Sequence, residues 1–523
     1  MKIKNLSVTL AILFASIIHS FCLAQEKAIH IGSSHQLFLD DFIIQKKENI
    51  QRKVQAAKKH NQNPLIVRAH QWEPVGYVMP SVLYDEEEKI FKAWLDGYGV
   101  GVFYFTSKDG IQWERPKLHL FPEFDNQPTN RVILSGYEFD TKEAPREKLA
   151  YLRSREDGWK YFCYQSGVIK DKEDPDPNRR YKMAFLWIDR EFRSPGAAKA
   201  GKLTAMGVAF SPDGIHWKPV NKPVSYATLD APFHITRDQS KKCWVMHGRA
   251  FGVISPGKKL AQASDPNFQY NMGRSVIRCE STDFLNWTPE KGEVVLSSDE
   301  SDSVMTEIYD MRPLNIHGMN LGLIHVFLNN PDNVTLPIQL GVSRDGKKWN
   351  RLEDRSSFLS PGELGDWDRG VFSPPVSDPV QVGDEIRFYY TGRNLLHSTR
   401  WKFDDDPKLL PAMAPYRGAL GFASIRRDRF VALEASYKPG IIQTKPFIHN
   451  GGTLHVNGAF KFGALQVSVL DENNKSIQKT TILEKDDTKI PLPALTKASS
   501  SKGSPIKLEF SIQNGRLFSF WFE

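Results

Sequence analysis

The stretch that decides the fold is Ser107-Lys-Asp109-Gly110-Ile-Gln-Trp113, because related stretches return along the chain. The other copies are Ser211-Pro-Asp213-Gly214-Ile-His-Trp217, Ser281-Thr-Asp283-Phe-Leu-Asn-Trp287, Ser343-Arg-Asp345-Gly346-Lys-Lys-Trp349 and a degenerate Ser424-Ile-Arg-Arg-Asp428-Arg-Phe430. The Asp side chain can accept backbone N–H groups in a tight turn, and Gly supplies a positive φ. The final aromatic residue then packs back on the strand before the turn. Five copies predict five repeated units.

Each copy follows a short run of β-forming residues, and paired β runs precede it. The runs before the copies are Val102–Thr106, Met206–Phe210, Ser275–Cys279, Ile338–Val342 and Ala419–Ala423. Strand, turn, strand, strand, Asp-Gly turn and strand make up one blade of a β-propeller. The copies are more widely spaced than compact propeller repeats of about 40–50 residues, so the extra length is expected in loops. The sequence predicts an all-β fold with a five-bladed propeller over residues 25–437.

The remainder of the chain has a different character. After a linker at Lys438-Pro439-Gly440, alternating apolar and polar residues over 444–523 predict a small C-terminal antiparallel β-sandwich. Its apolar strand faces suit structural packing, with glycan binding as the alternative. Near the start, Leu37–Ile44 is expected to close the propeller ring by pairing with the last blade, which makes Asp40 and Asp41 poor candidates for catalysis.

Residues 1–24 have the layout of a signal peptide. Lys2 and Lys4 precede an uncharged apolar run, Leu6–Ile18, and a small-residue site ends at Ala24. The apolar run is shorter than the roughly 20 residues that span a bilayer, and no later segment comes close. We therefore expect a periplasmic or secreted protein without a membrane span. A lipoprotein anchored at Cys22 is the weaker alternative.

Charge and cysteine content exclude several classes. The formal charge of +8 becomes +6 when the two leader lysines are removed, and the charges are spread along the chain. This balance is compatible with an acidic or sulfated polysaccharide or with ordinary solubility, whereas dense basic tracts typical of nucleic-acid binding are absent from the sequence. Cys163, Cys243 and Cys279 lack zinc-type spacing. No cofactor is expected, a structural calcium cannot be assigned, and the oligomeric state is open.

These motifs resemble those of a known group of enzymes. The five copies, together with Val78–Trp94, Arg180–Phe185 and Gly383–Gly392, are similar to the five-bladed propeller glycoside hydrolases of families 32, 43, 68, 117 and 130. Leu37–Ile44 and the later motifs most resemble a bacterial family 32-like group. The resemblance implies a secreted glycosidase that degrades poly- or oligosaccharides. It also implies an Asp at the start of the first blade, where this chain has Val78-Met-Pro-Ser81.

Any hydrolysis must therefore use other acids. Glycoside hydrolysis generally requires two carboxyl groups that face each other across the sugar. The candidates for catalytic residues are Glu307, Asp230, Asp171 and Asp310. We expect Glu307 to lie at the rim of blade four as the general acid, facing Asp230 across the funnel. Asp230 or Asp171 would be the base, and Asp310 is next in line.

Each acid also has a structural interpretation: a solvated loop for Asp171, a strand cap for Asp230, and an ion pair with Arg312 for Glu307 or Asp310. The candidates for substrate binding are Arg312, Tyr309, His247, Arg249, His325, Asp368, Arg369 and Trp367. Trp367 can stack on a sugar or fill a core, and a lone His on a strand is commonly structural. An acidic or sulfated glycan would require Arg249, Arg312 or Arg369 to face the funnel.

Two alternatives to a propeller glycosidase stay open. A non-catalytic glycan-binding propeller would explain the missing first-blade acid. A sialidase-like hydrolase would explain the likeness of the repeated motif to the Asp-box, but the Asp-box has one more residue between Asp and Gly, and its owners usually have six blades.

Overall fold

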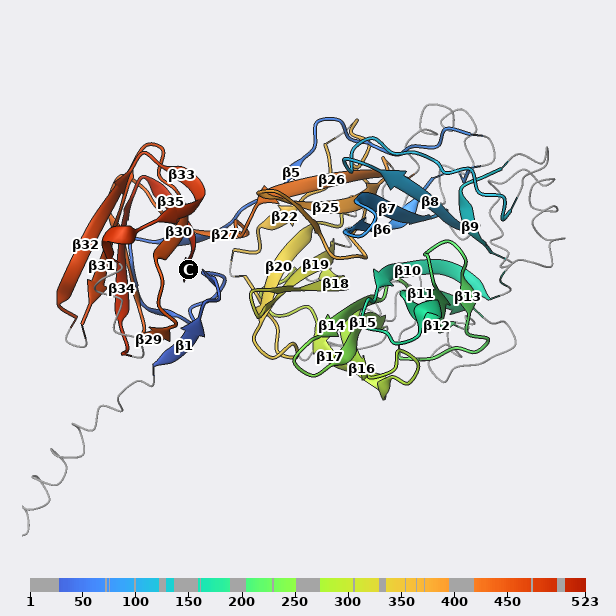
Figure 1. The fold of residues 1–523 in the computed structure, drawn as a ribbon, viewed down its shortest axis with the longest axis horizontal. Coiled ribbons are helices and arrows are strands. Elements are labelled where there is room, and N and C mark those ends of the chain that lie inside the picture. Colours follow the sequence, from blue (N-terminus) through green and yellow to red (C-terminus); the bar gives the residue numbers. More distant parts are fainter. Residues whose placement is uncertain are drawn as a thin grey trace, which may run out of the picture. The chain divides into compact units, whose positions relative to one another are not determined.

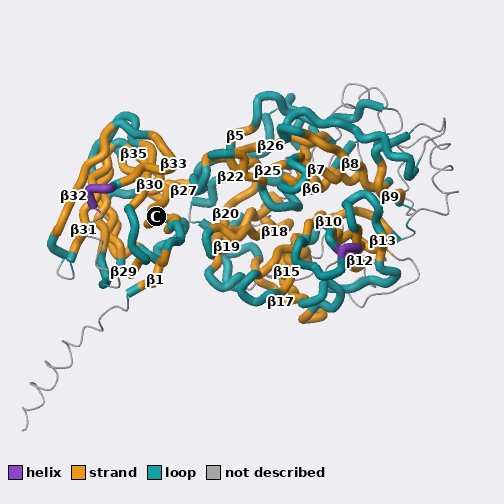
Figure 2. The backbone as a smooth tube through the Cα atoms, viewed as in Figure 1, coloured by secondary structure: helices purple, strands orange, loops and turns teal. Residues whose placement is uncertain are grey.

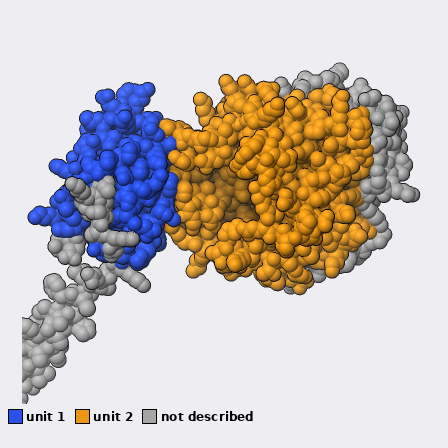
Figure 3. Space-filling model, viewed as in Figure 1, with its two compact units in different colours: residues 1–52, 431–523 blue, residues 53–430 orange. Residues whose placement is uncertain are grey.

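The computed structural model describes residues 28–70, 73–74, 76–97, 100–121, 128–135, 159, 161–188, 204–227, 230–250, 273–303, 306–328, 335–352, 354–363, 365–370, 372–394, 418–471, 474–495 and 504–523. The predicted signal peptide lies outside these residues. The described regular structure is β-strand apart from 3-10 turns at Pro177–Arg179 and Pro493–Leu495 (Figure 2). The chain forms two compact units, unit 1 (residues 1–52 and 431–523) and unit 2 (residues 53–430), coloured separately in Figure 3.

Unit 2 consists of five antiparallel sheets that follow one another along the chain (Figure 1). Sheet 1 contains β6 (Val78–Asp85), β7 (Ile90–Asp96), β8 (Gly101–Ser107) and β9 (Arg131–Leu134). Sheet 2 contains β10 (Phe162–Lys170), β11 (Tyr181–Ile188), β12 (Thr204–Ser211) and β13 (Lys218–Pro219). Sheet 3 contains β14 (His234–Asp238), β15 (Cys243–Ala250), β16 (Ser275–Ser281) and β17 (Thr288–Leu296). Sheet 4 contains β18 (Thr306–Ile316), β19 (Met319–Leu328), β20 (Ile338–Ser343), β21 (Asn350–Arg351) and β22 (Ser357–Leu359). Sheet 5 contains β23 (Phe372–Ser373), β24 (Val380–Val382), β25 (Glu385–Gly392), β26 (Ala419–Arg426) and β5 (Lys58–Lys59).

The repeated motif occupies the same place in all five sheets, beginning at the end of β8, β12, β16, β20 and β26. In the first copy, Asp109 Oδ1 accepts the backbone N–H groups of Ile111 and Gln112, both at 2.8 Å. The Asp of the next three copies accepts the same two bonds at the same distances. Gly110 has a φ of 73°, and Phe284 takes a φ of 68° at the equivalent position of the third copy. The predicted turn chemistry is therefore confirmed.

Each sheet also holds the motif of the next sheet. Trp94 of sheet 1 donates its indole N–H to Gly214 O at 2.7 Å. Arg179, in the turn between β10 and β11 of sheet 2, donates to Asp283 O at 2.8 Å. The His247 ring of sheet 3 lies edge-on to Trp349, with centroids 6.2 Å apart. Between β18 and β19 of sheet 4, His317 Nε2 lies 2.9 Å from Asp428 Oδ1 of the fifth copy. In sheet 5, the Tyr389 hydroxyl donates to Gly110 O of the first copy at 2.9 Å. The contacts thus run in a closed cycle, because sheet 5 holds the motif of sheet 1.

The outer strand of sheet 5 is β5, whose Lys58 and Lys59 pair with Ser424 and Ala423 of β26. The prediction that Leu37–Ile44 fills this position is wrong. Instead, β2 (Gln36–Leu37) pairs with β35, and β3 (Ile44–Glu48) pairs with β28, both in unit 1. The physical reason is burial, since the apolar side chains of this segment belong to the core of unit 1.

Unit 1 contains two main sheets, and β-strands from both ends of the chain contribute to them. One sheet contains β33 (Asp486–Pro491), β30 (Leu454–Ala459), β35 (Gly515–Phe522), β27 (Val431–Ala435) and β4 (Gln51–Val54), with β2 on β35. The other contains β3, β28 (Gly440–Thr444), β34 (Lys507–Gln513), β31 (Ala464–Leu470) and β32 (Ser476–Leu483). In addition, β1 (Ile29–Gly32) pairs in parallel with β29 (Phe447–His449).

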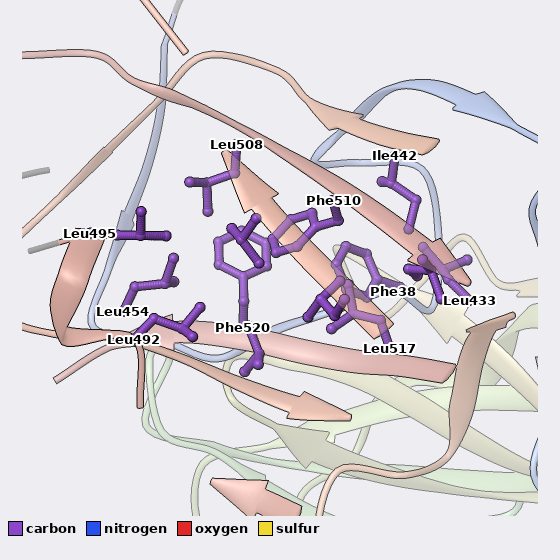
Figure 4. Packing of buried hydrophobic residues seen from close by; sticks show 14 of the residues in the cluster. Phe38, Leu433, Ile442, Leu454, Leu492, Leu495, Leu508, Phe510, Leu517 and Phe520 are labelled. Atoms are coloured by element: carbon purple, nitrogen blue, oxygen red, sulfur yellow. The ribbon is translucent and has the colours of Figure 1, made fainter. Parts of the chain in front are cut away.

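One apolar cluster draws residues from both main sheets and from the N-terminal segment. Figure 4 shows Phe38 packed near Phe510 and Leu517 in this cluster. The described part of unit 1 therefore includes residues 28–52 and 431–437, which the sequence predicts to be part of the propeller.

Candidate functional site

Asp310 lies at the centre of a polar cluster that joins sheets 3 and 4. Its Oδ1 is 3.1 Å from His234 Nε2 on β14, and its Oδ2 is 3.2 Å from His325 Nδ1 on β19. Burial would raise the pKa of Asp310, but the charge and hydrogen bonds of His325 and His234 outweigh burial and hold that pKa well below its usual range. Asp310 is thus a buried anion that is 1% exposed.

A β-bulge places the next side chain of the cluster. The register of β18 against β19 shifts between Ile308 and Asp310, so Tyr309 is the extra residue. A bulge re-aims the side chain it carries. The Tyr309 ring stacks on Phe327 with centroids 5.3 Å apart and also lies edge-on to His325.

Arg249, near the end of β15, connects Asp230 to Tyr309 and Asp310. It donates from Nη1 to Asp230 Oδ2 at 2.7 Å and from Nε to the Tyr309 carbonyl at 2.6 Å. Its guanidinium carbon lies 3.6 Å from the Tyr309 ring centroid, and Nη2 lies 3.7 Å from Asp310 Oδ2. Burial opposes its charge, yet Tyr309, Asp230 and Asp310 together raise the pKa of Arg249.

Glu307 forms a second carboxylate–arginine pair near the same ring. Its Oε2 accepts the backbone N–H of Arg274 at 3.1 Å and Nη1 of the same residue at 2.9 Å. The Arg274 guanidinium carbon lies 5.4 Å from the Tyr309 ring centroid and 4.8 Å from that of Phe327. Glu307 Oε1 is buried and has no hydrogen-bond partner among the described residues.

We define the Tyr309 cluster as Asp230, His234, Arg249, Arg274, Glu307, Tyr309, Asp310 and His325. Six of these residues were predicted from the sequence. His234 and Arg274 were not predicted, because the role of each depends on a carboxylate on another strand: Asp310 for His234 and Glu307 for Arg274. His234 stands in the same short segment as Asp230, whereas Arg274 has no local signal in the sequence.

Arg312 and His247 lie beside the cluster but have other partners. Arg312 is buried, donates to Val376 O at 3.0 Å and forms an ion pair with Asp378. The sequence alternative that pairs Arg312 with Glu307 or Asp310 is therefore not what the structure shows. His247 is fully buried against Trp349, and burial lowers its pKa well below the usual value.

Asp171 does not join the cluster. It lies in the turn after β10 and forms an ion pair with Lys182 at 2.8 Å. Asp171 was selected as an acid that precedes the strand Arg180–Phe185, on the expectation that this strand is the first of its sheet. That expectation is wrong, because Phe162–Lys170 forms the first strand of sheet 2. Asp171 therefore follows the first strand of its sheet, whereas Asp230 precedes that of sheet 3.

Trp367, Asp368 and Arg369 precede β23 in sheet 5. Asp368 is buried, accepts the Tyr390 hydroxyl at 2.7 Å and pairs with Lys59 at 2.7 Å. Trp367 stacks on the Tyr390 ring. These contacts of Trp367 and Asp368 lie within sheet 5 and do not involve the Tyr309 cluster.

Sheet 1 carries a buried acid that is not among the sequence-predicted candidates. Asp96 ends β7 directly opposite Val78, is fully buried, and accepts the backbone N–H of Gln165 at 3.1 Å. The neighbouring backbone is irregular, since Met79 has a φ of 50° and the register shifts between Val78 and Ser81.

Comparisons with known proteins show similarity in structure only. No family model matches the chain, and no curated protein matches it. The similar solved structures include glycoside hydrolases of families 43, 32 and 130, which are among the propeller families that the sequence motifs resemble. Among the described residues, no helix has the length and apolar character needed to cross a bilayer.

Three of these structures illustrate the level of similarity. A family 43 arabinoxylan arabinofuranohydrolase from Bacillus subtilis is 12% identical, with a TM-score of 0.41 over 89% of this chain and 99% of that one. A family 32 β-fructofuranosidase from Bombyx mori is 11% identical, with a TM-score of 0.40 over 89% and 94%. An N-acetylgalactosamine deacetylase from F. plautii is 14% identical, with a TM-score of 0.40 over 76% and 96%. At these values the matches locate no catalytic residue in this chain.

Proposed function

We propose that unit 2 is a five-bladed β-propeller and that unit 1 is a β-sandwich. The closed cycle in which each sheet holds the motif of the next supports five blades around one axis. The single apolar core shared by the two main sheets of unit 1 supports the sandwich.

We further propose that the protein is a secreted glycoside hydrolase whose carboxylate pair is Asp230 and Glu307. The observation that carries this proposal is the Tyr309 cluster, in which each of these two carboxylates binds an arginine that faces the same tyrosine ring. The Asp230 side chain is 38% exposed, so it can reach a bound sugar. Asp310 is buried, so its role is to hold other residues of the Tyr309 cluster and not to contact substrate.

The two acids differ in a way that fits a division of roles. Asp230 is accessible and its Oδ2 is held by the Arg249 guanidinium, which suits a base or nucleophile that must meet the substrate in a fixed direction. Glu307 is nearly enclosed, and its unpartnered Oε1 is the atom that can donate a proton to the leaving oxygen.

The experiment that tests this proposal exposes the mature protein to a panel of neutral, uronic and sulfated poly- and oligosaccharides. Released reducing sugar on one member supports hydrolysis. The anomer formed first, observed by NMR, then separates retention from inversion, which require carboxyl separations of about 5–5.5 Å and 6.5–9.5 Å respectively. The N-terminus of the exported protein should be Gln25 if residues 1–24 are a signal peptide.

A non-catalytic glycan-binding propeller is the second candidate, and a specific observation favours it. The inner strand of sheet 1 begins with Val78-Met79-Pro80-Ser81 and offers no carboxylate where the resembled families have one. This candidate predicts saturable binding to a member of the same panel without release of reducing sugar.

A further inference from the structure

Asp230 belongs to a loop, so its orientation depends on its side-chain contacts. It precedes β14 and therefore has no ladder of strand hydrogen bonds to fix it. Its Oδ1 accepts the N–H of the next residue, Ala231, at 2.9 Å in a local bond. A contact that ties it to another strand is the 2.7 Å bond from Arg249 Nη1 on β15.

Arg249 is itself held from several directions. Its guanidinium is 1% exposed, lies on the Tyr309 ring and donates from Nε to the Tyr309 carbonyl. Because the guanidinium group is planar, fixing Nε and one face also fixes the direction of Nη1. The direction in which Arg249 presents a donor to Asp230 is thus set by Tyr309.

Asp310 completes this support. It lies 3.7 Å from Arg249 Nη2 and bonds His234 and His325 on two different strands. A buried carboxylate with three such neighbours has little freedom to turn. The negative charge of Asp310 offsets the cost of burying the Arg249 guanidinium, while Arg249 Nη1 stays directed at Asp230.

We propose that Arg249 is a positioning residue that fixes the reactive orientation of Asp230, and that Asp310 holds Arg249 in place. This inference rests on the hydrolase proposal for Asp230. It differs from the sequence hypothesis, in which Arg249 binds substrate and Asp310 is a reserve catalytic acid. Arg249 acts through Asp230 and touches no substrate.

The test compares Arg249→Lys and Arg249→Met with a matched pair at Arg351. Arg351 also forms a buried ion pair, 2.6 Å from Asp302 with side chains 2% and 5% exposed, but it lies on β21 at the outer edge of sheet 4. Lysine retains the charge but lacks the fork that holds Tyr309 and Asp230 together. We expect Arg249→Lys to lower kcat about 10²-fold with KM within about twofold, since a misplaced catalytic group costs about that much. Arg249→Met should lower kcat further.

Three outcomes would overturn the proposal. A raised KM with unchanged kcat would make Arg249 a substrate-binding residue. An equal loss of kcat in the Arg351→Lys control would show that the loss comes from general destabilisation of the protein. A crystal structure of Arg249→Lys with the Asp230 carboxylate unmoved would remove the positioning role itself.

The crystal structure also separates this proposal from the hydrolase proposal. If the native protein hydrolyses no sugar on the panel, the hydrolase proposal fails. A displaced Asp230 carboxylate in Arg249→Lys would still support positioning by Arg249, and an unmoved one would still contradict it. Arg249→Met, which cannot bind the Asp230 carboxylate, should displace that carboxylate at least as far.

Discussion

Sheets 3 and 4 contain buried titratable side chains with contrasting partners. Asp310, His234 and His247 are all buried, yet they differ in their partners. Asp310 is compensated by two histidines and an arginine, whereas His247 has an aromatic neighbour and a pKa lowered by burial. Burial of this kind makes protein stability depend on pH.

His247 should make the protein lose stability as the pH falls below about 6.5. Its folded-state pKa lies below the unfolded value of 6.5, so in this range the unfolded chain takes up a proton that the folded protein excludes. The loss is about 1.4 kcal/mol per pH unit until the folded-state pKa is reached. His247→Phe should reduce this slope, because phenylalanine retains the edge contact with Trp349 but does not titrate.

The measurement is urea unfolding of both proteins at several pH values between 7.5 and 5. His234 has a lowered pKa of the same sign, but it is present in both proteins and cancels in the comparison. Identical slopes for the two proteins would show that His247 does not contribute to the pH dependence.

At this scale the sequence identified residue types better than their partners. Glu307, Tyr309 and Asp310 stand close together in the sequence, and the structure keeps them close in one cluster. Arg312 belongs to the same stretch, but β18 directs it to Asp378, because the pairing partner of a strand residue depends on the adjacent sheet. A short sequence motif holds no information on that partner.

At the scale of elements, the repeated turn both ends a strand and receives a contact from the preceding sheet. Gly214 has a φ of 80°, and a Cβ there would lie 2.6 Å from the Trp94 ring. Gly346 has a φ of 72° in the same turn of the fourth copy, where the nearest atom, on Asn320, lies at 3.8 Å. The two positions share backbone conformation and differ in available space.

Gly214→Ala should therefore destabilise the protein more than Gly346→Ala. Both substitutions cost about 1–2 kcal/mol because an L-residue adopts the left-handed conformation at a penalty. The clash with Trp94 should add about 1–3 kcal/mol at Gly214 only. Midpoints of urea unfolding test the difference, and equal midpoints would contradict a tight contact between Trp94 and this turn.

The repeat made the sheets predictable because its Asp, Gly and Trp have local physical roles. Strands without such local signals were harder to predict. In β10 the apolar residues are interrupted by Gln165-Ser166-Gly167, and β5 pairs through only two lysines. β5 pairs with β26 across a long sequence separation, which local patterns do not show.

At the scale of the whole molecule, the two ends of the described chain share one core in unit 1. Phe38 is fully buried, and its ring lies 6.2 Å from that of Phe510 and 5.9 Å from that of Phe520. The sequence predicted strands in this region, but an apolar strand can fill either core, so its periodicity does not choose between them.

Phe38→Ala should therefore weaken unit 1 and leave unit 2 intact. Removing a buried phenylalanine costs about 3–5 kcal/mol. Hydrogen exchange should show lost protection in residues 431–523 and unchanged protection in β26. Phe42→Ala is the matched control, because Phe42 is 43% exposed in the same segment. Lost protection in β26 alone would instead support ring closure by the N-terminal segment.

The central claim is that Asp230 and Glu307 form a catalytic carboxylate pair, and the rate of Glu307→Gln tests it most directly. On the glycan that the native protein hydrolyses, kcat should fall by about 10²–10⁴-fold while glycan affinity stays nearly unchanged, since glutamine retains the shape but cannot supply the proton. Asp171→Asn, outside the Tyr309 cluster, should retain full activity. A fully active Glu307→Gln would contradict the claim.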